Sequence, residues 1–215
     1  MGAYLGVDWA GDGWVAVAFD EVEFDHAAVF EEIGGLWHRY EDSAERVLVD
    51  VPIGLREGNS DRGAENGGDR KCDVLAREVL GPRHAAVFTP PVREAARKRR
   101  YPAAKRVNER TAGRSLSKQA FAISDRIAAV DDLLRNVPEA RAAFAESHPE
   151  VCFRAFAGEP LQHSKAIAGG YAERMRALAE FDTGAPPVVQ AVAEAAGGAD
   201  VTGDDGLDAV ALAHT

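Results

Sequence analysis

The stretch Tyr4-Leu5-Gly6-Val7-Asp8 decides the fold, because it is an apolar run that ends on an acid. A short continuous apolar run is typical of a strand that is covered on both faces. The turn residues Gly11-Asp12-Gly13 follow, and a second apolar run spans residues 13–19, so the two runs are expected to form an antiparallel hairpin. A carboxylate at the end of a buried strand is costly to desolvate unless a cation neutralises it.

The same pattern recurs further along the chain. Val47-Leu48-Val49 ends on Asp50, Glu146 follows a short apolar run, and Asp205 and Asp208 open a final apolar helix. Several such acids meeting at one edge of a sheet would bind hard divalent cations, so Mg²⁺ or Mn²⁺ is the expected cofactor. The predicted metal ligands are Asp8, Asp50, Asp205 and Asp208, and the predicted catalytic residues are these four and Glu146.

Each of these acids also has an ordinary structural interpretation. Asp is a common turn former, which would account for Asp8 and Asp50 without any chemistry. Glu146 suits the N-terminus of a helix, where negative charge is favourable, and Asp205 suits a helix N-cap. Asp208 has helical residues on both sides and shares a helix face with Asp205, so a cap does not explain it. Both interpretations stay open at the level of the sequence.

The order of predicted elements indicates a mixed α/β fold. Strands are expected at 4–7, 13–19, 21–30, 47–51 and 141–145, a long loop at 54–68, and helical stretches at 31–41, 70–80, 92–108, 118–135, 150–157, 169–181, 186–196 and 205–214. Leading strands joined by tight turns must be antiparallel, whereas strands separated by helices are expected to run parallel to the first. The sequence therefore predicts one domain over residues 1–215, with a basic, mostly helical insertion at about 54–138.

Charge is unevenly distributed along the chain. The formal net charge is −10, yet residues 69–118 hold 14 Lys and Arg against 5 Asp and Glu, a balance of +9 against −19 for the remainder. A basic segment on an acidic protein suggests a polyanionic partner, here DNA or RNA. The predicted substrate contacts in this segment are Arg97, Arg99, Arg100 and Lys118. A solvated helix face is the ordinary alternative for such a basic run.

Composition narrows the class of protein further. No run of 18 apolar residues and no secretory signal is visible, so no membrane partner is expected. Cys72 and Cys152 form no CxxC pair, which favours free thiols in a reducing, cytoplasmic location. An acid-rich, Lys-poor composition also suits a high-salt cytoplasm, so the composition resembles that of proteins from halophiles.

Five short motifs are distributed in order along nearly the whole chain. They are Gly6-Val7-Asp8-Trp9-Ala10-Gly11, Val49-Asp50-Val51-Pro52-Ile53-Gly54-Leu55, Arg70-Lys71-Cys72-Asp73, Glu146-Ser147-His148-Pro149-Glu150 and Asp204-Asp205-Gly206-Leu207-Asp208-Ala209. Together they resemble the domain of unknown function 429 family, which is regarded as a family of predicted nucleases. That resemblance implies a ribonuclease H-like mixed sheet flanked by helices.

The second half of the chain is also similar, more weakly, to RuvC-type Holliday-junction resolvases. The shared order is Ser147-His148-Pro149-Glu150-Val151, then Gly158 and Lys165, then Asp205 and Asp208. This similarity implies that Asp8, Asp50, Asp205 and Asp208 fall on the resolvase carboxylates, although the resolvases carry Glu in place of Asp50. Because such resolvases are dimers, a homodimer is a further implied partner. Lys165 is predicted to hold the scissile phosphate.

Metal-dependent hydrolysis of phosphodiester bonds in DNA or RNA is the leading functional prediction. Two bound cations would activate a water and stabilise the leaving oxygen. A non-catalytic nucleic-acid-binding protein on the same scaffold is the first alternative. The second alternative is a nucleotide-binding kinase or ATPase. Residues 6–11 faintly resemble the first phosphate loop of such proteins, but those proteins need two domains of this kind.

Overall fold

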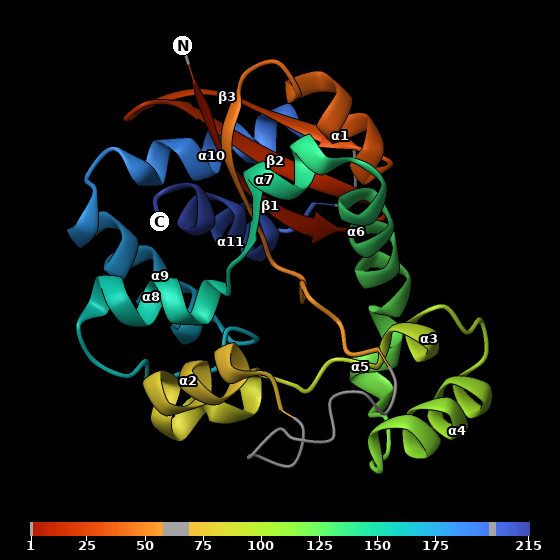
Figure 1. The fold of residues 1–215 in the computed structure, drawn as a ribbon. Coiled ribbons are helices and arrows are strands. Elements are labelled where there is room, and N and C mark those ends of the chain that lie inside the picture. The colour runs from red at the N-terminus through yellow and green to blue at the C-terminus, as the bar shows by residue number, and fades with distance from the viewer. Residues whose placement is uncertain (1, 58–68, 198–200) are drawn as a thin grey trace. The chain divides into compact units, whose positions relative to one another are not determined.

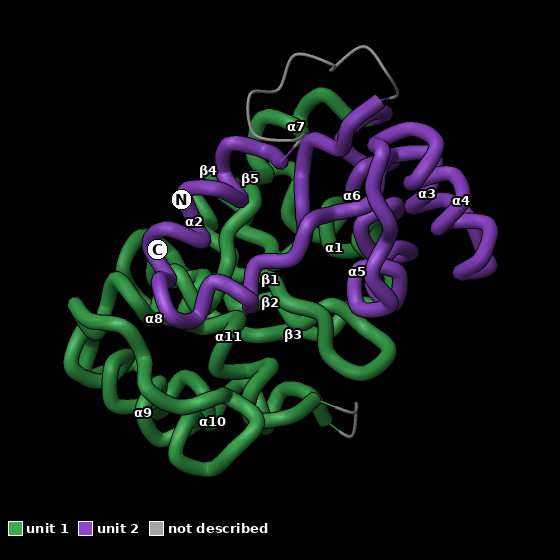
Figure 2. The backbone as a smooth tube through the Cα atoms, turned by 90° about the horizontal axis from the view of Figure 1, so that it is seen from below, with its two compact units in different colours: residues 1–51, 137–215 green, residues 52–136 purple. Residues whose placement is uncertain are grey.

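The computed structural model of the chain describes residues 2–57, 69–197 and 201–215. The chain divides into two compact units, which Figure 2 shows in different colours. Residues 1–51 and 137–215 form unit 1, and residues 52–136 form unit 2. Unit 2 is thus inserted in sequence between the two segments of unit 1.

A five-stranded mixed sheet lies at the centre of unit 1 (Figure 1). Its strands are β1 (Ala3–Ala10), β2 (Gly13–Asp20), β3 (Glu23–Phe30), β4 (Ala44–Val49) and β5 (Phe144–Glu146), in the order β3-β2-β1-β4-β5. The first three strands are antiparallel, and β4 and β5 run parallel to β1, which confirms the predicted mixed α/β sheet. The carboxyl ends of β1, β4 and β5 therefore lie at the same edge of the sheet.

Different helices cover the two faces of this sheet. One face carries Gly6, Val15 and Val17 and packs against α11 (Gly203–Ala213), with α8 (Pro149–Ala157), α9 (Ala168–Phe181) and α10 (Ala185–Ala195) in the same apolar core. The opposite face packs against α1 (Ile33–Tyr40) and α7 (Pro138–Ala143). Because β1 is covered on both faces, its apolar run is continuous rather than alternating.

Unit 2 is helical in its described part. It contains α2 (Lys71–Leu80), the 3₁₀ helix η2 (Gly81–Ala86), α3 (Arg93–Ala96), α4 (Tyr101–Ala112), α5 (Lys118–Ala122) and α6 (Ser124–Asn136). Its apolar clusters are small: one gathers Val92, Ala95 and Val107, and another gathers Ala104, Leu116 and Ala120. Ion pairs supplement these small apolar clusters, for example those of Asp131 with Arg93 and Arg97.

Three predicted elements differ in the structure, and one of them, the helical stretch at 92–108, is divided into α3 and α4. Residues 141–143 belong to α7, because Pro138 begins a helix there, and the strand starts only at Phe144. The predicted helix at 118–135 is broken into α5 and α6 at Ile123, whose backbone (φ −106°, ψ 6°) leaves the helical conformation. Pro102 lies in the first turn of α4, where its missing N–H is not needed. Of the predicted loop at 54–68, residues 58–68 lie outside the described residues.

The two cysteines agree with the prediction that they form no disulfide. Cys72 is exposed and Cys152 is buried. Within the described residues, no helix is long and apolar enough to cross a membrane. The cytoplasmic location and the high-salt setting stay predictions.

Candidate functional site

Asp8 reaches the site from the strand at the centre of the sheet. It shares a face of β1 with Gly6 and Ala10, since side chains alternate along a strand. This is the face that α11 covers, and Asp8 is only 9% exposed there. One carboxylate oxygen, Oδ1, accepts the backbone N–H of Trp9 at 2.7 Å. A single hydrogen bond to a buried carboxylate leaves most of its negative charge uncompensated.

Asp50 follows β4 and lies beside Asp8 at the same edge of the sheet. The parallel ladder pairs Gly6 with Leu48, and the Asp50 N–H continues it by donating to the Val7 carbonyl oxygen at 3.1 Å. Alternation then places the side chains of Asp8 and Asp50 on the same face. Two acids that are 42 positions apart in the chain are thus brought together by strand pairing.

Asp208 comes to this face from α11, the last helix. Gly6 makes that approach possible, because a Cβ at Gly6 would lie 2.1 Å from the Ala209 carbonyl oxygen and 2.3 Å from the Ala213 nitrogen. No side chain fits between strand and helix at this point, so α11 crosses β1 in close contact. Asp208 directly precedes Ala209, and it is only 2% exposed. We call Asp8, Asp50 and Asp208 the three-aspartate cluster.

Lys165 supplies a positive charge to the three-aspartate cluster. Its Nζ donates to Asp208 Oδ2 at 2.6 Å. Lys165 belongs to the connection between α8 and α9, and Glu173 on α9 accepts backbone N–H groups from Gln162 at 2.7 Å and His163 at 2.9 Å. Arg174 also donates to the His163 carbonyl oxygen, at 3.3 Å. The backbone that carries Lys165 is therefore anchored to α9 on its N-terminal side.

Burial and mutual repulsion set the protonation of this group. Burial raises the pKa of Asp8 well above its usual value, and the charges of Asp50 and Asp208 raise it further. Burial also raises the pKa of Asp50, and it raises the pKa of Asp208 to about 7 although Lys165 opposes the shift. Burial alone would lower the pKa of Lys165, but the charges of Asp208 and Asp8 outweigh it and raise that pKa. The four groups thus act as one electrostatic unit.

The donor set suits a hard divalent cation. Three carboxylates against one ammonium leave two formal negative charges without a counter-charge in this group. Carboxylate oxygens are the ligands that Mg²⁺ prefers, and Mg²⁺ needs only a few of them.

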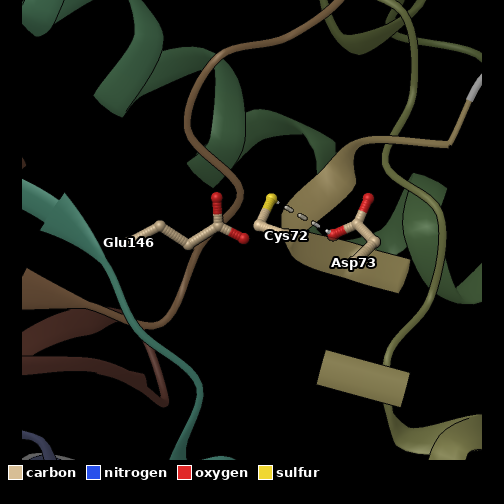
Figure 3. Close-up of side chains that lie close together, drawn as sticks. All are labelled: Cys72, Asp73 and Glu146. Atoms are coloured by element: carbon tan, nitrogen blue, oxygen red, sulfur yellow. Dashed lines mark hydrogen bonds between the residues drawn. The ribbon is translucent and has the colours of Figure 1, made fainter. Parts of the chain in front are cut away.

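Glu146 lies at the same edge but on a different face. It ends β5, where Figure 3 shows its side chain, and it pairs with Val49 in the parallel ladder. Side chains alternate, so Glu146 leaves the sheet on the face opposite to that of Asp50. Its negative charge still contributes to raising the pKa of Asp50, after the larger effect of burial. Glu146 therefore borders the three-aspartate cluster from the other face of the sheet.

Asp205, a predicted metal ligand, takes part in helix capping. Its Oδ2 accepts the Thr202 N–H at 2.9 Å and the Thr202 hydroxyl at 2.7 Å, while the Thr202 hydroxyl accepts the Asp205 N–H. This reciprocal capping box begins α11. Its neighbour Asp204 is the residue whose charge acts on Lys165 and Asp208. The structure thus brings Asp8, Asp50 and Asp208 together and leaves Asp205 at the cap.

The predicted substrate contacts in unit 2 fall into two kinds. Arg97 is held in a network: its Nη2 donates to Asp131 at 2.7 Å and also to Asp132. Arg99, Arg100 and Lys118 are exposed, and their side chains form no ion pair within the described part of the chain. Three exposed cations in unit 2 thus stay available to a polyanion, whereas Arg97 is largely neutralised.

Tyr101 follows the exposed arginines but has a packing role. Its hydroxyl donates to the Leu116 carbonyl oxygen at 2.9 Å, and its ring centroid lies 5.4 Å from that of Phe121. Ser117 accepts the Ala120 N–H and caps α5. An aromatic platform for a nucleobase is therefore not what Tyr101 provides.

Sequence reasoning missed several residues that shape these units. Arg174 is fully buried and donates to Glu150 Oε1 through Nε at 3.0 Å and Nη2 at 2.5 Å. An arginine in an amphipathic helix gives no local signal of such burial, although its position on the apolar stripe of α9 is a hint. In unit 2, Asp73 is buried at the start of α2 beside Cys72 (Figure 3), and Arg70 pairs with it at 2.5 Å.

Comparison with known proteins gives the family. A search of curated proteins and a search of solved structures return no match. A family profile described as "Protein of unknown function (DUF429)" matches residues 6–215. That match spans nearly the whole chain, including β1, β4 and α11, which carry the three-aspartate cluster. The chain therefore belongs to the DUF429 family.

Proposed function

We propose that this protein is a metal-dependent nuclease with a ribonuclease H-like unit 1. The single observation that carries the proposal is the three-aspartate cluster. Its members come from two parallel strands and a distant helix and lie on one face. Burial raises the pKa of each of them, and the charges of neighbouring acids raise it further. Buried carboxylates that destabilise one another are retained most readily where a cation binds them.

The fold assignment is supported by the arrangement of the sheet. Three antiparallel strands precede two parallel ones. Asp8 lies near the carboxyl end of β1 and Asp50 directly follows β4, an arrangement that the family resemblance implies. The cluster sits at the carboxyl edge of the parallel strands, which is the usual place for ligand sites in open α/β sheets.

Each residue has a proposed role. Asp8, Asp50 and Asp208 would hold Mg²⁺ or Mn²⁺, which when bound activates water and stabilises the leaving oxygen of a phosphodiester. Lys165 would bind the scissile phosphate, since an ammonium on a flexible stem can follow a moving charge. Glu146 would influence the protonation of Asp50 from the opposite face. Arg99, Arg100 and Lys118 would contribute non-specific attraction for the nucleic-acid backbone.

Substitution of Asp8 tests this proposal most directly. In Asp8→Asn, cleavage of a panel of DNA and RNA substrates in Mn²⁺ should fall at least about 100-fold, because one of the three proposed metal ligands loses its charge. The matched control is Asp12→Asn, because Asp12 is exposed in the β1–β2 turn. Cleavage by Asp8→Asn at the wild-type rate, with folding intact by circular dichroism, would exclude the nuclease.

A second candidate function is binding of nucleic acid without cleavage. The exposed cations Arg99, Arg100 and Lys118 favour it independently of the three-aspartate cluster. On this alternative, affinity for nucleic acid should not change when Mg²⁺ is replaced by EDTA at matched ionic strength, and no substrate in the panel should be cut. A Mg²⁺-dependent product would reject it.

A further inference from the structure

Lys165 is itself a cation placed on a proposed metal ligand. We propose that Lys165 and the divalent cation compete for Asp208, so that the ammonium must leave this carboxylate before the cation can take it. This inference rests on the proposed function and concerns the regulation of the same site. It assigns Lys165 a role before any phosphate is bound, as a built-in competitor.

The direct contact is the first support. Lys165 Nζ lies 2.6 Å from Asp208 Oδ2, which is within hydrogen-bonding distance, so the ammonium already occupies an acceptor position of that oxygen. An ammonium and a divalent cation repel each other, so both cannot stay close to one carboxylate at low cost. Occupation of Asp208 by one therefore disfavours the other.

The unequal exposure of the two partners shows which one would move. The side chain of Asp208 is 3% exposed and is fixed in α11, whereas that of Lys165 is 46% exposed. Rotation of the half-exposed lysine stem would place its ammonium in water, and the incoming cation would replace its positive charge beside Asp208. Displacement would thus be a rotation of Lys165 away from a stationary carboxylate.

The anchored backbone keeps the competitor close after it leaves. Glu173 holds the N–H groups of Gln162 and His163, and the Ile167 N–H donates to the Ser164 carbonyl oxygen at 3.2 Å. Gly170 approaches the same connection, since a Cβ there would lie 1.9 Å from the Ser164 carbonyl oxygen. With this backbone fixed, Lys165 stays within reach of Asp208 and competes intramolecularly.

The consequence is a measurable loss of apparent metal affinity. When only a fraction of molecules presents a free ligand set, the apparent affinity falls by that fraction. Removing the ammonium should therefore strengthen metal binding, although it removes a residue of the proposed substrate site. If Lys165 instead helped the cation to bind, removing its ammonium would weaken metal binding.

The test measures Mn²⁺ binding by the full chain, using electron paramagnetic resonance of free Mn²⁺ at constant pH and salt. Lys165→Met keeps the stem and removes the charge, and it should bind Mn²⁺ about 5-fold more tightly or better, as for typical couplings between sites. Lys165→Arg keeps the charge and should stay near the wild-type affinity. Arg176→Met is the matched control, because Arg176 is an exposed cation on α9 of the same unit and its loss changes net charge equally.

The outcomes separate the two proposals. Tighter binding by Lys165→Met, with Arg176→Met unchanged, supports the competition. Mn²⁺ binding that Asp208→Asn weakens but Lys165→Met leaves unchanged or weaker would overturn the competition alone. Absence of Mn²⁺ binding in the wild type and in every variant would overturn the metal site and the competition together. Thermal unfolding of each variant verifies that it is folded, and Lys165→Gln replaces Lys165→Met if the latter does not fold.

Discussion

At the scale of single residues, Asp208 shows how burial can turn an ordinary acid into a destabilising one. It is 2% exposed, and its ion pair with Lys165 does not offset the cost of burial, so its pKa rises to about 7. The sequence predicted Asp8, Asp50 and Asp208 because each stands where an acid is out of place in an apolar pattern. It left both roles open for Asp205, cap and ligand, because both fit the start of a helix, and the structure shows the capping box.

The raised pKa of Asp208 predicts a particular pH dependence of stability. Its pKa is about 7 in the folded chain against a reference of 3.8, so the folded state binds the proton more tightly and loses stability as pH rises from about 4 to about 7. Asn cannot titrate, so Asp208→Asn in EDTA should gain stability over wild type across this range, on the order of 3 kcal/mol at about pH 8. Urea unfolding at several pH values measures the difference.

The control for this experiment is Asp12→Asn, which removes an exposed acid from the same unit. The difference in the free energy of unfolding between Asp12→Asn and wild type should stay nearly constant over the same pH range. A constant difference for Asp208→Asn as well would mean that the carboxylate titrates normally and that the cluster is not electrostatically strained.

At the scale of elements, the contact between β1 and α11 builds the cluster. Gly6 is the sequence feature that permits it, and a glycine inside a strand is a recognised sign of close backbone approach. The strand β5 was placed three residues too early, since alanine-rich residues 141–143 fit either a strand or a helix until Pro138 is given weight. The break at Ile123 had no local signal at all. Tertiary packing decides such boundaries.

Gly6→Ala should separate α11 from β1. A Cβ would lie 2.1 Å from the Ala209 carbonyl oxygen, so the helix must shift, and we expect a loss of about 3 kcal/mol in the free energy of unfolding. Since Asp208 moves with α11, Mn²⁺ binding should weaken too. Gly34→Ala is the control, because Gly34 lies on α1 with nothing within 4 Å of an added Cβ. Unfolding that matches wild type for Gly6→Ala would contradict the close packing.

The buried pair of Glu150 and Arg174 joins α8 to α9 and can be tested by a double-mutant cycle. Arg174→Met leaves Glu150 buried without its partner and should cost about 3 to 5 kcal/mol of stability. Adding Glu150→Gln removes that charge, so the double variant should recover part of the loss. Arg176→Met on the same helix should change stability little, since Arg176 is exposed. Additive losses in the cycle would show that the two side chains act independently.

At the scale of the whole molecule, the count of charges along the chain overstated the free positive charge. The sequence has a basic segment at residues 69–118, yet several of its cations are paired with acids of unit 2, such as Arg93 and Arg97 with Asp131. These partners lie 34 or more positions away, so spacing along the chain could not reveal them. Among the predicted substrate contacts, Arg99, Arg100 and Lys118 are exposed and have no ion pair within the described residues, so they can meet a polyanion.

Salt dependence of nucleic-acid binding tests this distinction between free and paired cations. Binding that neutralises phosphates weakens with salt, with a slope of about −0.9 in log affinity per contact on duplex DNA. Replacing Arg99, Arg100 and Lys118 together by Ala should lower the magnitude of that slope by up to about 3, because each can contribute one phosphate contact. Arg176→Ala in unit 1 is the control and should leave the slope unchanged. Arg97→Ala should instead lower the stability of the protein, since it breaks the contacts with Asp131 and Asp132. An unchanged slope in the triple variant would place the nucleic-acid surface elsewhere, because exposed cations that release no counterions do not touch the phosphate backbone.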